Sequence, residues 1–243
     1  MEDKELIFGR NPVLEYLRGA EHGSRMELFI ANSAHGKIID AILEQARGKK
    51  ITVRHVEKDF FTQIGPSSSH QGVALKLYGQ TSGSSGSLVE KSAKKRGVLV
   101  LLDQITDPHN AGSIIRTAEA LGCDGVIMPK SHAAGITPSV VKSSAGATAH
   151  IEINQIGNVA AFLDEAKKCG FWIIGTDDSG TTELQNLGAV RPAVLIIGSE
   201  NSGMRRLTAE KCDFIVRIPL AGRISSLNAS VAAGIVLYEI MKD

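Results

Sequence analysis

The stretch VLVLLDQITDPHNAGSIIRTAEALG, residues 98–122, indicates which fold the larger part of the chain adopts. It begins with an unbroken run of valine and leucine, which is typical of a strand buried on both faces. A turn follows at Asp107 and Pro108, and then a predicted helix of small residues that contains one arginine, Arg116. A buried strand that runs into a helix is one unit of an open α/β sheet, and such sheets bind ligands at the C-terminal ends of their strands.

The composition is that of an ordinary globular protein, with 43% hydrophobic and 22% charged residues among 243. The net charge of +1 neither requires nor excludes a nucleic-acid partner. The three cysteines are isolated, which favours reduced thiols and indicates no metal site. The chain has no apolar run of the roughly 20 residues that a membrane span needs, and no signal peptide. We therefore predict a cytoplasmic protein with no membrane partner.

A change of composition predicts two domains. Residues 79–87 read GQTSGSSGS, a sequence that cannot bury apolar surface and is typical of a flexible linker. The polar EKSAKKRG that follows extends the exposed connection. We predict a first domain over 1–78, a linker over 79–95 and a second domain over 96–243.

Strands and helices alternate in both predicted domains. The first is expected to be a small α/β sandwich with helices at 11–19, 36–49 and 57–64 and strands at 26–31, 51–56 and 72–77. The second is expected to have strands at 98–105, 124–129, 150–154, 171–177, 193–199 and 214–220, with helices at 110–121, 137–147, 157–169, 204–211 and 225–241. Strands this apolar predict a doubly wound parallel sheet covered by helices.

Polar residues gather after three of these strands. In the first loop Asn110 can cap the helix or point into a site, and Arg116 can lie in a site or in solvent. The second loop, IIGSENSGMRRL at 196–207, places Gly198 and Glu200 at a strand end, where Gly198 allows a ligand to approach the backbone closely. In the third, at 217–241, Ser225 or Ser226 can cap the last helix, with Asn228 beside them.

Three familiar nucleotide and hydrolase sites are unfavoured. The spacing from Gly198 to Gly203 is that of a phosphate loop, but Met204 and Arg205 stand where that loop needs lysine and serine or threonine. A GxGxxG fingerprint is absent, which argues against a nicotinamide-dependent oxidoreductase. A GxSxG elbow is absent too, which argues against an α/β-hydrolase.

Taken together, DPHNAGSIIRTAEALG, IIGSENSGM and IPLAGRISSLNASVA resemble the three motifs of the SpoU (TrmH) family of RNA ribose 2′-O-methyltransferases. The first domain, which ends in HQGVAL at 70–75, is similar to the L30e-like RNA-binding domain found in one branch of this family. That branch includes enzymes that methylate a guanosine of 23S rRNA. The resemblance implies a catalytic domain with a C-terminal trefoil knot, and a homodimer formed through the knotted regions.

The resemblance also implies a cofactor, S-adenosyl-L-methionine, and positions for its site. The family pattern places the cofactor at Thr176, Gly198, Ile218 and Leu227. The functional positions that match are Asn110, Arg116, Glu200, Ser226 and Asn228, with no metal. Where the family often has glycine this chain has Asn201, a residue type that tolerates a left-handed backbone.

The implied reaction is attack of a ribose 2′-hydroxyl on a sulfonium methyl group, and it leaves the role of Arg116 open. The family proposal is that this arginine activates the hydroxyl, although a guanidinium is a poor base at neutral pH. Alternatively Arg116 clamps the neighbouring phosphate and orients the hydroxyl. Glu200 and Asn110 would then hold the guanidinium, while Ser226 and Asn228 would orient substrate or cofactor.

The expected substrate is a guanosine of 23S rRNA. The same reaction on tRNA or another rRNA nucleotide, and a non-catalytic RNA-binding or assembly factor, are the alternatives. Because the net charge is close to zero, RNA binding would require basic residues to be gathered in space. The candidates for such a patch are Arg10, Arg25, Arg54, Lys58, Arg205, Arg206 and Arg223.

Overall fold

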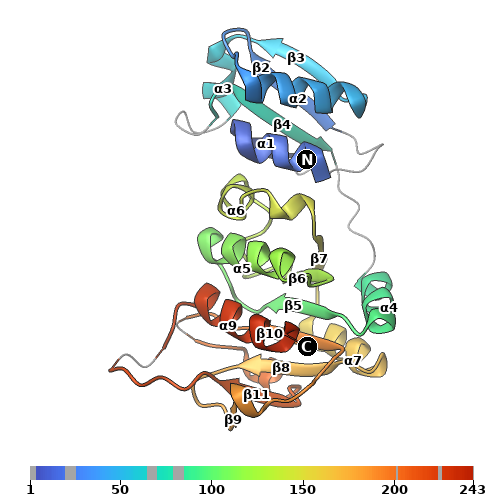
Figure 1. Cartoon of the computed structure of the whole chain (residues 1–243), viewed down its shortest axis with the longest axis vertical. Helices are drawn as coiled ribbons and strands as arrows, with labels where there is room; N and C mark the ends of the chain where they lie inside the picture. The colour runs from blue at the N-terminus through green and yellow to red at the C-terminus, as the bar shows by residue number, and fades with distance from the viewer. Residues whose placement is uncertain are drawn as a thin grey trace. The chain divides into compact units, whose positions relative to one another are not determined.

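The computed structural model describes residues 4–19, 26–64, 70–78, 85–200, 202–223 and 226–242. The chain forms two compact units, and Figure 1 traces the elements of each. The first unit comprises residues 1–81 and 136–150, and the second comprises 82–135 and 151–243.

The first unit is built on a four-stranded mixed sheet with the order β1-β4-β2-β3. Its strands are β1 (Lys4–Phe8), β2 (Met26–Ala31), β3 (Thr52–Val56) and β4 (Val73–Tyr78). β4 pairs antiparallel with β1 and β2, whereas β2 and β3 are parallel. Strand β1 was not predicted, while β2, β3 and β4 fall within one residue of their expected bounds.

Helices cover both faces of this sheet, as the alternation of its apolar residues requires. Leu28, Ile30 and Leu75 face α1 (Arg10–Gly19) and α2 (Lys37–Gly48). The intervening residues, among them Phe29 and Ala74, face α3 (Lys58–Ile64) and pack on Phe61. The predicted α/β sandwich is therefore confirmed for this unit.

A later segment joins the first unit, contrary to the predicted domain limits. Residues 136–150 contain α6 (Pro138–Ser143) and a 3-10 turn, η1 (Ala147–Ala149). Val141 belongs to the apolar core of α1 and α2, and Ile136 and Ala149 pack against that core. The sequence predicts one helix over 137–147, whereas α6 ends at Ser143 and the backbone turns left-handed at Ala145 and Gly146, with φ values of 51° and 89°.

The second unit is built on a seven-stranded sheet with the order β7-β6-β5-β10-β8-β11-β9. All its strand pairs are parallel. The strands are β5 (Val98–Leu102), β6 (Gly125–Pro129), β7 (Glu152–Ile156), β8 (Trp172–Thr176), β9 (Thr182–Glu183), β10 (Ala193–Ile197) and β11 (Phe214–Arg217). The predicted parallel sheet is confirmed, and β9 is the strand that the sequence did not reveal.

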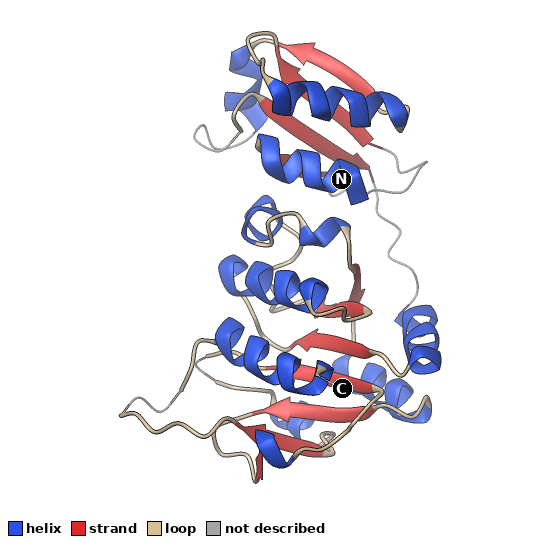
Figure 2. Ribbon diagram, in the orientation of Figure 1, coloured by secondary structure: helices blue, strands red, loops and turns tan. Residues whose placement is uncertain are grey.

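Helices lie on both faces of this sheet (Figure 2). Leu99, Leu101 and Ile173 point to a core shared with α4 (Ser85–Lys95) and α7 (Val159–Lys168). The alternate residues point to the opposite face, where α5 (Pro108–Ala120) and α9 (Ala229–Met241) lie side by side. The remaining helical segments are η2 (Leu184–Asn186) and the short α8 (Arg206–Ala209).

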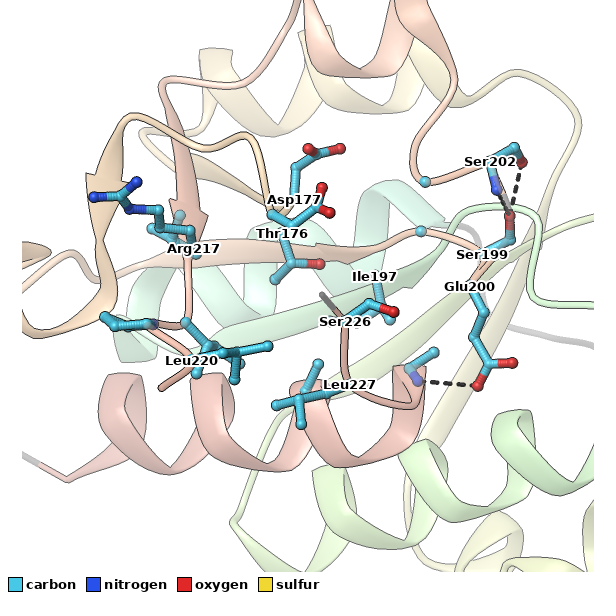
Figure 3. A pocket seen from close by; sticks show the side chains of 18 of the residues that line it. Thr176, Asp177, Ile197, Ser199, Glu200, Ser202, Arg217, Leu220, Ser226 and Leu227 are labelled. Atoms are coloured by element: carbon cyan, nitrogen blue, oxygen red, sulfur yellow. Dashed lines mark hydrogen bonds between the residues drawn. The ribbon is translucent and has the colours of Figure 1, made fainter. Parts of the chain in front are cut away.

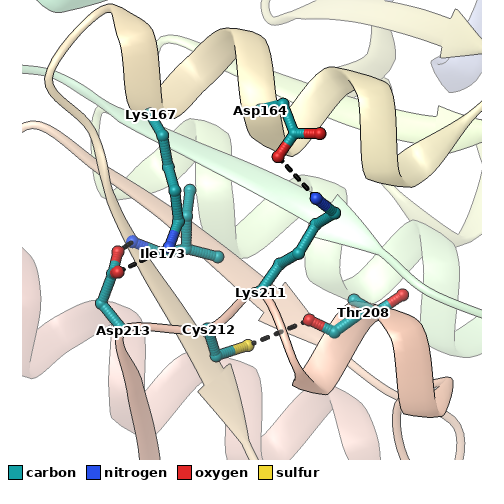
Figure 4. A network of polar contacts seen from close by, with 7 residues as sticks. All are labelled: Asp164, Lys167, Ile173, Thr208, Lys211, Cys212 and Asp213. Carbon is teal, nitrogen blue, oxygen red and sulfur yellow. Dashed lines mark hydrogen bonds and ion pairs between the residues drawn. The ribbon is translucent and has the colours of Figure 1, made fainter.

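Polar contacts fix α8 and the start of β11 against α7 (Figure 4). Lys211 Nζ donates to Asp164 at 2.5 Å and Lys167 Nζ to Asp213 at 2.6 Å. Asp213 also accepts from the backbone N–H of Ile173 at 2.8 Å. The carboxylate of Asp213 thereby aligns β11 with β8, the two strands that end beside the site described below.

The linker prediction is wrong for residues 85–95, which form α4. Leu88, Val89 and Ser92 are buried on one face of this helix, and Ser92 Oγ donates to Asp124 at 2.6 Å. The buried apolar residues Leu88 and Val89 are adjacent in a segment rich in serine and lysine, and this pattern is too weak to predict a helix. Residues 79–84 of the predicted linker, Ser225 and Asn201 lie outside the described residues.

Candidate functional site: a pocket at the ends of three parallel strands

A pocket of about 850 Å³ lies at the C-terminal ends of β8, β10 and β11 in the second unit. Figure 3 shows Thr176, Ile197, Ser226 and Leu227 around its centre, with Glu200 towards one end. This is where a parallel α/β sheet is expected to bind a ligand.

All four positions expected for the cofactor line this pocket: Thr176, Gly198, Ile218 and Leu227. Glu200 and Ser226, which were expected to act on substrate or cofactor, line it too. Thr176 contributes less polarity than its side chain suggests, because its hydroxyl donates to the carbonyl of Ile196 at 3.1 Å. The pocket therefore joins residues of the second and third motifs, and Asn110 of the first motif reaches it through its hydrogen bond to Glu200.

Gly198 is required by its own loop. Ser199 and Gly203 exchange two backbone hydrogen bonds of 3.0 and 2.9 Å, and this pairing closes a tight hairpin. A Cβ on Gly198 would lie 2.4 Å from the carbonyl carbon of Gly203 and 2.5 Å from the nitrogen of Met204. The sequence interpretation, close approach by a ligand, missed that the nearest neighbour is this hairpin.

Two helices begin at the site, and their N-caps differ from those expected. Asp107 caps α5 by accepting from the N–H groups of His109 and Asn110 at 3.1 and 3.2 Å. Asn228 caps α9 through its Oδ1, which accepts from the backbone N–H groups of Ser230 and Val231. Asn110 and Ser226 are therefore not the caps, and the side chain of Asn110 is available for other contacts.

Glu200 joins all three loops through one carboxylate oxygen. Its Oε1 accepts from Asn110 Nδ2 at 3.1 Å, from Asn228 Nδ2 and from the backbone N–H of Ala229 at 3.2 Å. Asn228 Nδ2 also donates to Asn110 Oδ1 at 2.9 Å. Because Asn228 Oδ1 must accept from the helix N–H groups, its amide orientation is fixed and its Nδ2 must face Glu200.

Arg116 lies on α5 with its side chain exposed. It makes no hydrogen bond or ion pair with any residue that the structure describes. The expected clamp of its guanidinium by Glu200 and Asn110 is not formed in this structure, in which Glu200 Oε1 accepts from Asn110, Asn228 and Ala229. Since no carboxylate in the described part of the chain pairs with it, the positive charge of Arg116 is available to a phosphate group.

Several acidic residues of the site were not predicted, although each follows a buried strand. Asp103 is fully buried after β5, accepts from the backbone N–H of Arg205 at 2.9 Å and pairs with Arg205 Nε at 3.5 Å. This contact ties the end of the hairpin loop to β5. The combinations LLD at 101–103 and TDD at 176–178 were the available signal, because carboxylates immediately after parallel strands lie at the ligand-binding edge.

The pocket carries a negative balance. Its lining includes four carboxylates and two guanidiniums: Asp177, Asp178, Glu183 and Glu200, against Arg217 and Arg223. Arg217 is already paired with Glu183 at 2.7 Å. The hydroxyl of Ser179 donates to Asp177 at 2.5 Å and holds the pKa of that carboxyl below its ordinary value; burial opposes this, and the Ser179 N–H supports it. Asp177 therefore stays ionised at neutral pH.

Neither a metal centre nor a membrane helix is found in the described parts of the chain. No group of three histidine, cysteine, aspartate or glutamate residues is placed to hold an ion there. No helix among those residues has the length and apolarity needed to cross a bilayer.

Burial raises the pKa of the Cys123 and Cys212 thiols to about 12, so both remain neutral at ordinary pH.

Both parts of the sequence match known protein families. Residues 97–238 match the SpoU rRNA Methylase family, and residues 6–79 match the domain described as RNA 2′-O ribose methyltransferase substrate binding. The chain is 36% identical to "Putative TrmH family tRNA/rRNA methyltransferase YacO" of Bacillus subtilis (strain 168), over 99% of this chain and 96% of that protein. It is 38% identical to a Staphylococcus aureus (strain COL) protein with the same family description, over 100% and 97%.

A solved structure is similar over both units. The SpoU methyltransferase AviRb from Streptomyces viridochromogenes, crystallised with the cofactor AdoMet, aligns with a TM-score of 0.82 and 26% identity. The alignment covers 98% of this chain and 89% of that one.

Proposed function

Because the chain belongs to the SpoU rRNA Methylase family, we propose that it methylates the ribose 2′-hydroxyl of a guanosine in 23S rRNA. The chain is a methyltransferase that acts on RNA and uses S-adenosylmethionine. The observation that carries the finer proposal is that two motif loops line one pocket and that Glu200, at its edge, joins both to Asn110 of the first motif. We propose that the first unit holds the RNA and the second unit carries out the transfer, so that binding by the first raises the local RNA concentration at the second.

The residues of the pocket fit S-adenosylmethionine in size and charge. A volume of about 850 Å³ lies within the roughly 300–1,000 Å³ of pockets that hold ligands of this size. The ligand carries a positive sulfonium and a positive amino group against one carboxylate, which suits a lining with excess carboxylate charge. Ile218, Leu220 and Leu227 supply apolar surface for its uncharged parts. When bound, the cofactor supplies an activated methyl group.

Arg116 is proposed to hold the RNA rather than to take the proton. A guanidinium stays protonated at neutral pH and is a poor general base. Its exposed position on α5 and its freedom from carboxylates suit a contact with the phosphate beside the target ribose. Such a contact would fix the hydroxyl in line with the methyl group, and solvent would take the proton. Asn110 and Asn228, held by Glu200, would orient the ribose.

A homodimer is part of the proposal. Val231, Ile235 and Tyr238 lie on one exposed stripe of α9, with exposed fractions of 50%, 39% and 63%. The opposite side of α9, including Ala233 and Leu237, is already buried in the unit. Exposed apolar side chains in a row are typical of a protein interface. A knotted C-terminal segment and a cytoplasmic location remain predictions.

Transfer of radiolabelled methyl groups tests the substrate. The purified chain is incubated with labelled S-adenosylmethionine and, separately, unmodified 23S rRNA, 16S rRNA and pooled tRNA. We expect label in 23S rRNA, recovered after digestion as 2′-O-methylguanosine. Label only in tRNA would overturn the substrate choice and favour the alternative that the relatives' descriptions also name. Cofactor binding without transfer to any RNA would overturn catalysis and favour an RNA-binding assembly factor.

A further inference from the structure

A second pocket, about 530 Å³, lies in the first unit and is separate from the cofactor site. Its polar lining is Arg10, Ser33, Lys58, His70 and Gln71. These residues come from the start of α1, the loop after β2, the start of α3 and the turn before β4. No carboxylate is among the lining residues that the structure describes, and their charge is opposite to that of the first pocket.

The two cations of this pocket have no ionic partner among the described residues. Arg10 Nε and Nη1 donate to the backbone carbonyls of Gln71 and His35, both at 3.2 Å, so the guanidinium is held in place while its charge stays unneutralised. Lys58 is exposed and makes no hydrogen bond or ion pair within the described ranges.

Other basic residues expected to bind RNA are differently placed. Arg54 pairs with Glu27, Arg205 with Asp103 and Arg206 with Glu210. Arg223 lines the cofactor pocket, and Arg25 lies outside the described residues. Of the seven candidates, Arg10 and Lys58 are therefore the pair that the structure gathers in one cavity without counter-ions.

A third donor, His70, is held in one orientation. Its ring stacks on Phe61 with a centroid distance of 4.7 Å and an interplanar angle of 9°. Its Nδ1 accepts from the backbone N–H of Gly72 at 3.0 Å, so a neutral ring carries its proton on Nε2 and offers it as a donor.

The turn that holds these groups is conformationally restricted. Gln71 has a φ of 48°, which is uncommon for a residue with a side chain, and Gly72 has a φ of 76°. A Cβ on Gly72 would lie 3.3 Å from that of Ala31, so the turn is also packed closely against β2. The backbone strain keeps the Gln71 carbonyl against Arg10 and supports a preformed binding site.

We propose that this pocket binds a phosphodiester of the RNA, with Arg10 and Lys58 on the phosphate oxygens and His70 Nε2 donating to the same nucleotide. The inference rests on the proposed function in one respect, namely that the bound polymer is RNA. Cationic and neutral donors without carboxylates select a phosphate. The volume exceeds that of a phosphate group alone, and the hydroxyl of Ser33 and the amide of Gln71 can contact the attached ribose or base.

Filter binding of the full chain to unmodified 23S rRNA, without cofactor and over a range of salt concentrations, tests this site. Lys58→Gln is the main variant, because the side chain has no structural contact to lose. We expect it to raise Kd about three- to tenfold and to lower the slope of log Kd against log salt by about one. Arg10→Lys keeps the charge but not the two carbonyl contacts, and should weaken binding as well.

Arg47→Gln is the matched control. Arg47 is an exposed cation at the far end of α2, about 15 Å from the helix start that follows His35. It should change Kd less than twofold. Equal losses in the control and Lys58→Gln would mean non-specific charge attraction and would overturn the site, as would wild-type binding by Lys58→Gln and Arg10→Lys.

Two further measurements distinguish RNA binding at this pocket from binding of a small anion and from the proposed methyl transfer. Calorimetry with inorganic phosphate shows whether a small anion is the ligand: saturable phosphate binding that Lys58→Gln abolishes, with RNA affinity unchanged, would overturn RNA binding here. Methyl transfer is measured on the same variants. If no RNA is methylated but Lys58→Gln still weakens RNA binding, the proposed reaction fails and the binding site stands.

Discussion

Glu200 and Arg116 represent two kinds of functional side chain. Glu200 is engaged within the chain through one of its oxygens, which accepts three hydrogen bonds from Asn110, Asn228 and Ala229. Arg116 is engaged with none of the described residues. Substitution should therefore affect them differently: loss of Glu200 disturbs the arrangement of three loops, whereas loss of Arg116 removes only a contact to the substrate.

Arg116→Ala is expected to leave the free energy of unfolding within about 0.5 kcal/mol of wild type, because the side chain is exposed and unpaired. Methyl transfer should fall by about a hundredfold or more, the scale of losing one group that stabilises a transition state. Chemical denaturation and single-turnover transfer at saturating cofactor measure the two effects. Lys168→Ala, an exposed cation on α7, is the control, and an Arg116→Ala variant as fast as wild type would contradict the proposed phosphate contact.

Glu200→Ala is expected to slow transfer by at least about tenfold, because Asn110 and Asn228 lose the acceptor that orients them. Its cost in stability should be about 1 kcal/mol, since water can replace the lost acceptor at this exposed position. The same two assays apply. Glu210→Ala, an exposed glutamate on the surface of the same unit, should leave transfer unchanged; if it slowed transfer equally, the network would not be the reason.

Ser179→Ala is expected to raise the pKa of Asp177, because it removes the hydroxyl that lowers it most. The folded pKa is depressed, so its contribution to stability is present above the unfolded value of about 3.9 and is lost as pH falls through the folded value. As the pH falls, the variant should therefore lose the stabilisation by ionised Asp177 at a higher pH than wild type does. Carbon-detected NMR titration of the Asp177 carboxyl measures the midpoint, and an unchanged midpoint would contradict the assignment. Ser139→Ala, on α6, is the control.

At the level of elements, the hairpin at 199–203 depends on Gly198 for space and the cofactor pocket depends on the hairpin for one wall. A side chain at position 198 would meet backbone atoms, which cannot rotate away as a flexible side chain can. The hairpin wall of the pocket can therefore follow strand β10 only because residue 198 is a glycine.

Gly198→Ala is expected to weaken S-adenosylmethionine binding by more than about tenfold, because a Cβ would lie 2.4 Å from the backbone of Gly203 and displace the loop. Calorimetry measures the affinity, and thermal unfolding shows whether the protein remains folded. Gly157→Ala is the control, because a Cβ there meets nothing within 4 Å. Unchanged cofactor affinity in a folded Gly198→Ala protein would contradict the role of the hairpin.

The elements that could be predicted from the sequence are those whose signal is local. The run VLVLL and the alternating ITVRHV identify strands because burial on two faces or on one leaves its own pattern. Strand β1 pairs at an edge and was missed, and α4 was obscured by serines and lysines although it buries Leu88 and Val89. Its burial depends on β7 and α7, which no window around residue 88 contains.

The residues of the candidate site likewise include some that the sequence predicts and others whose contacts it cannot predict. The four cofactor positions came from a family resemblance, and all four line the pocket. The role of Asp103 could not be predicted, because it depends on a contact with Arg205, 102 residues away. The expected contact between Glu200 and Arg116 is not formed in this structure, and the sequence could not show that two asparagines donate to Oε1 of that carboxylate.

At the scale of the whole molecule, the two units have complementary chemistry. The pocket of the second unit carries excess carboxylate charge, and that of the first carries unneutralised cations. A net charge of +1 is therefore compatible with binding RNA, because it conceals this separation.

Ile235→Asp is expected to convert a homodimer into a monomer, because it places a charge in the exposed apolar stripe of α9. Light scattering coupled to size exclusion measures the mass. Ile38→Asp is a close control, since Ile38 is 38% exposed against 39% for Ile235 but lies on α2. A wild-type chain that is already monomeric at micromolar concentration would contradict the proposed dimer.

The two contacts of Asn228 leave this position without a conservative replacement. Its oxygen caps α9 while its nitrogen donates to Glu200 and Asn110. Aspartate would keep the cap but set a second carboxylate against Glu200, and serine would keep the cap but has no amide to donate. Glutamine has both groups one methylene too far from the backbone. Natural variation at residue 228 is thus restricted by two neighbours at once, and a change there would alter helix initiation and the ordering of the site in a single step.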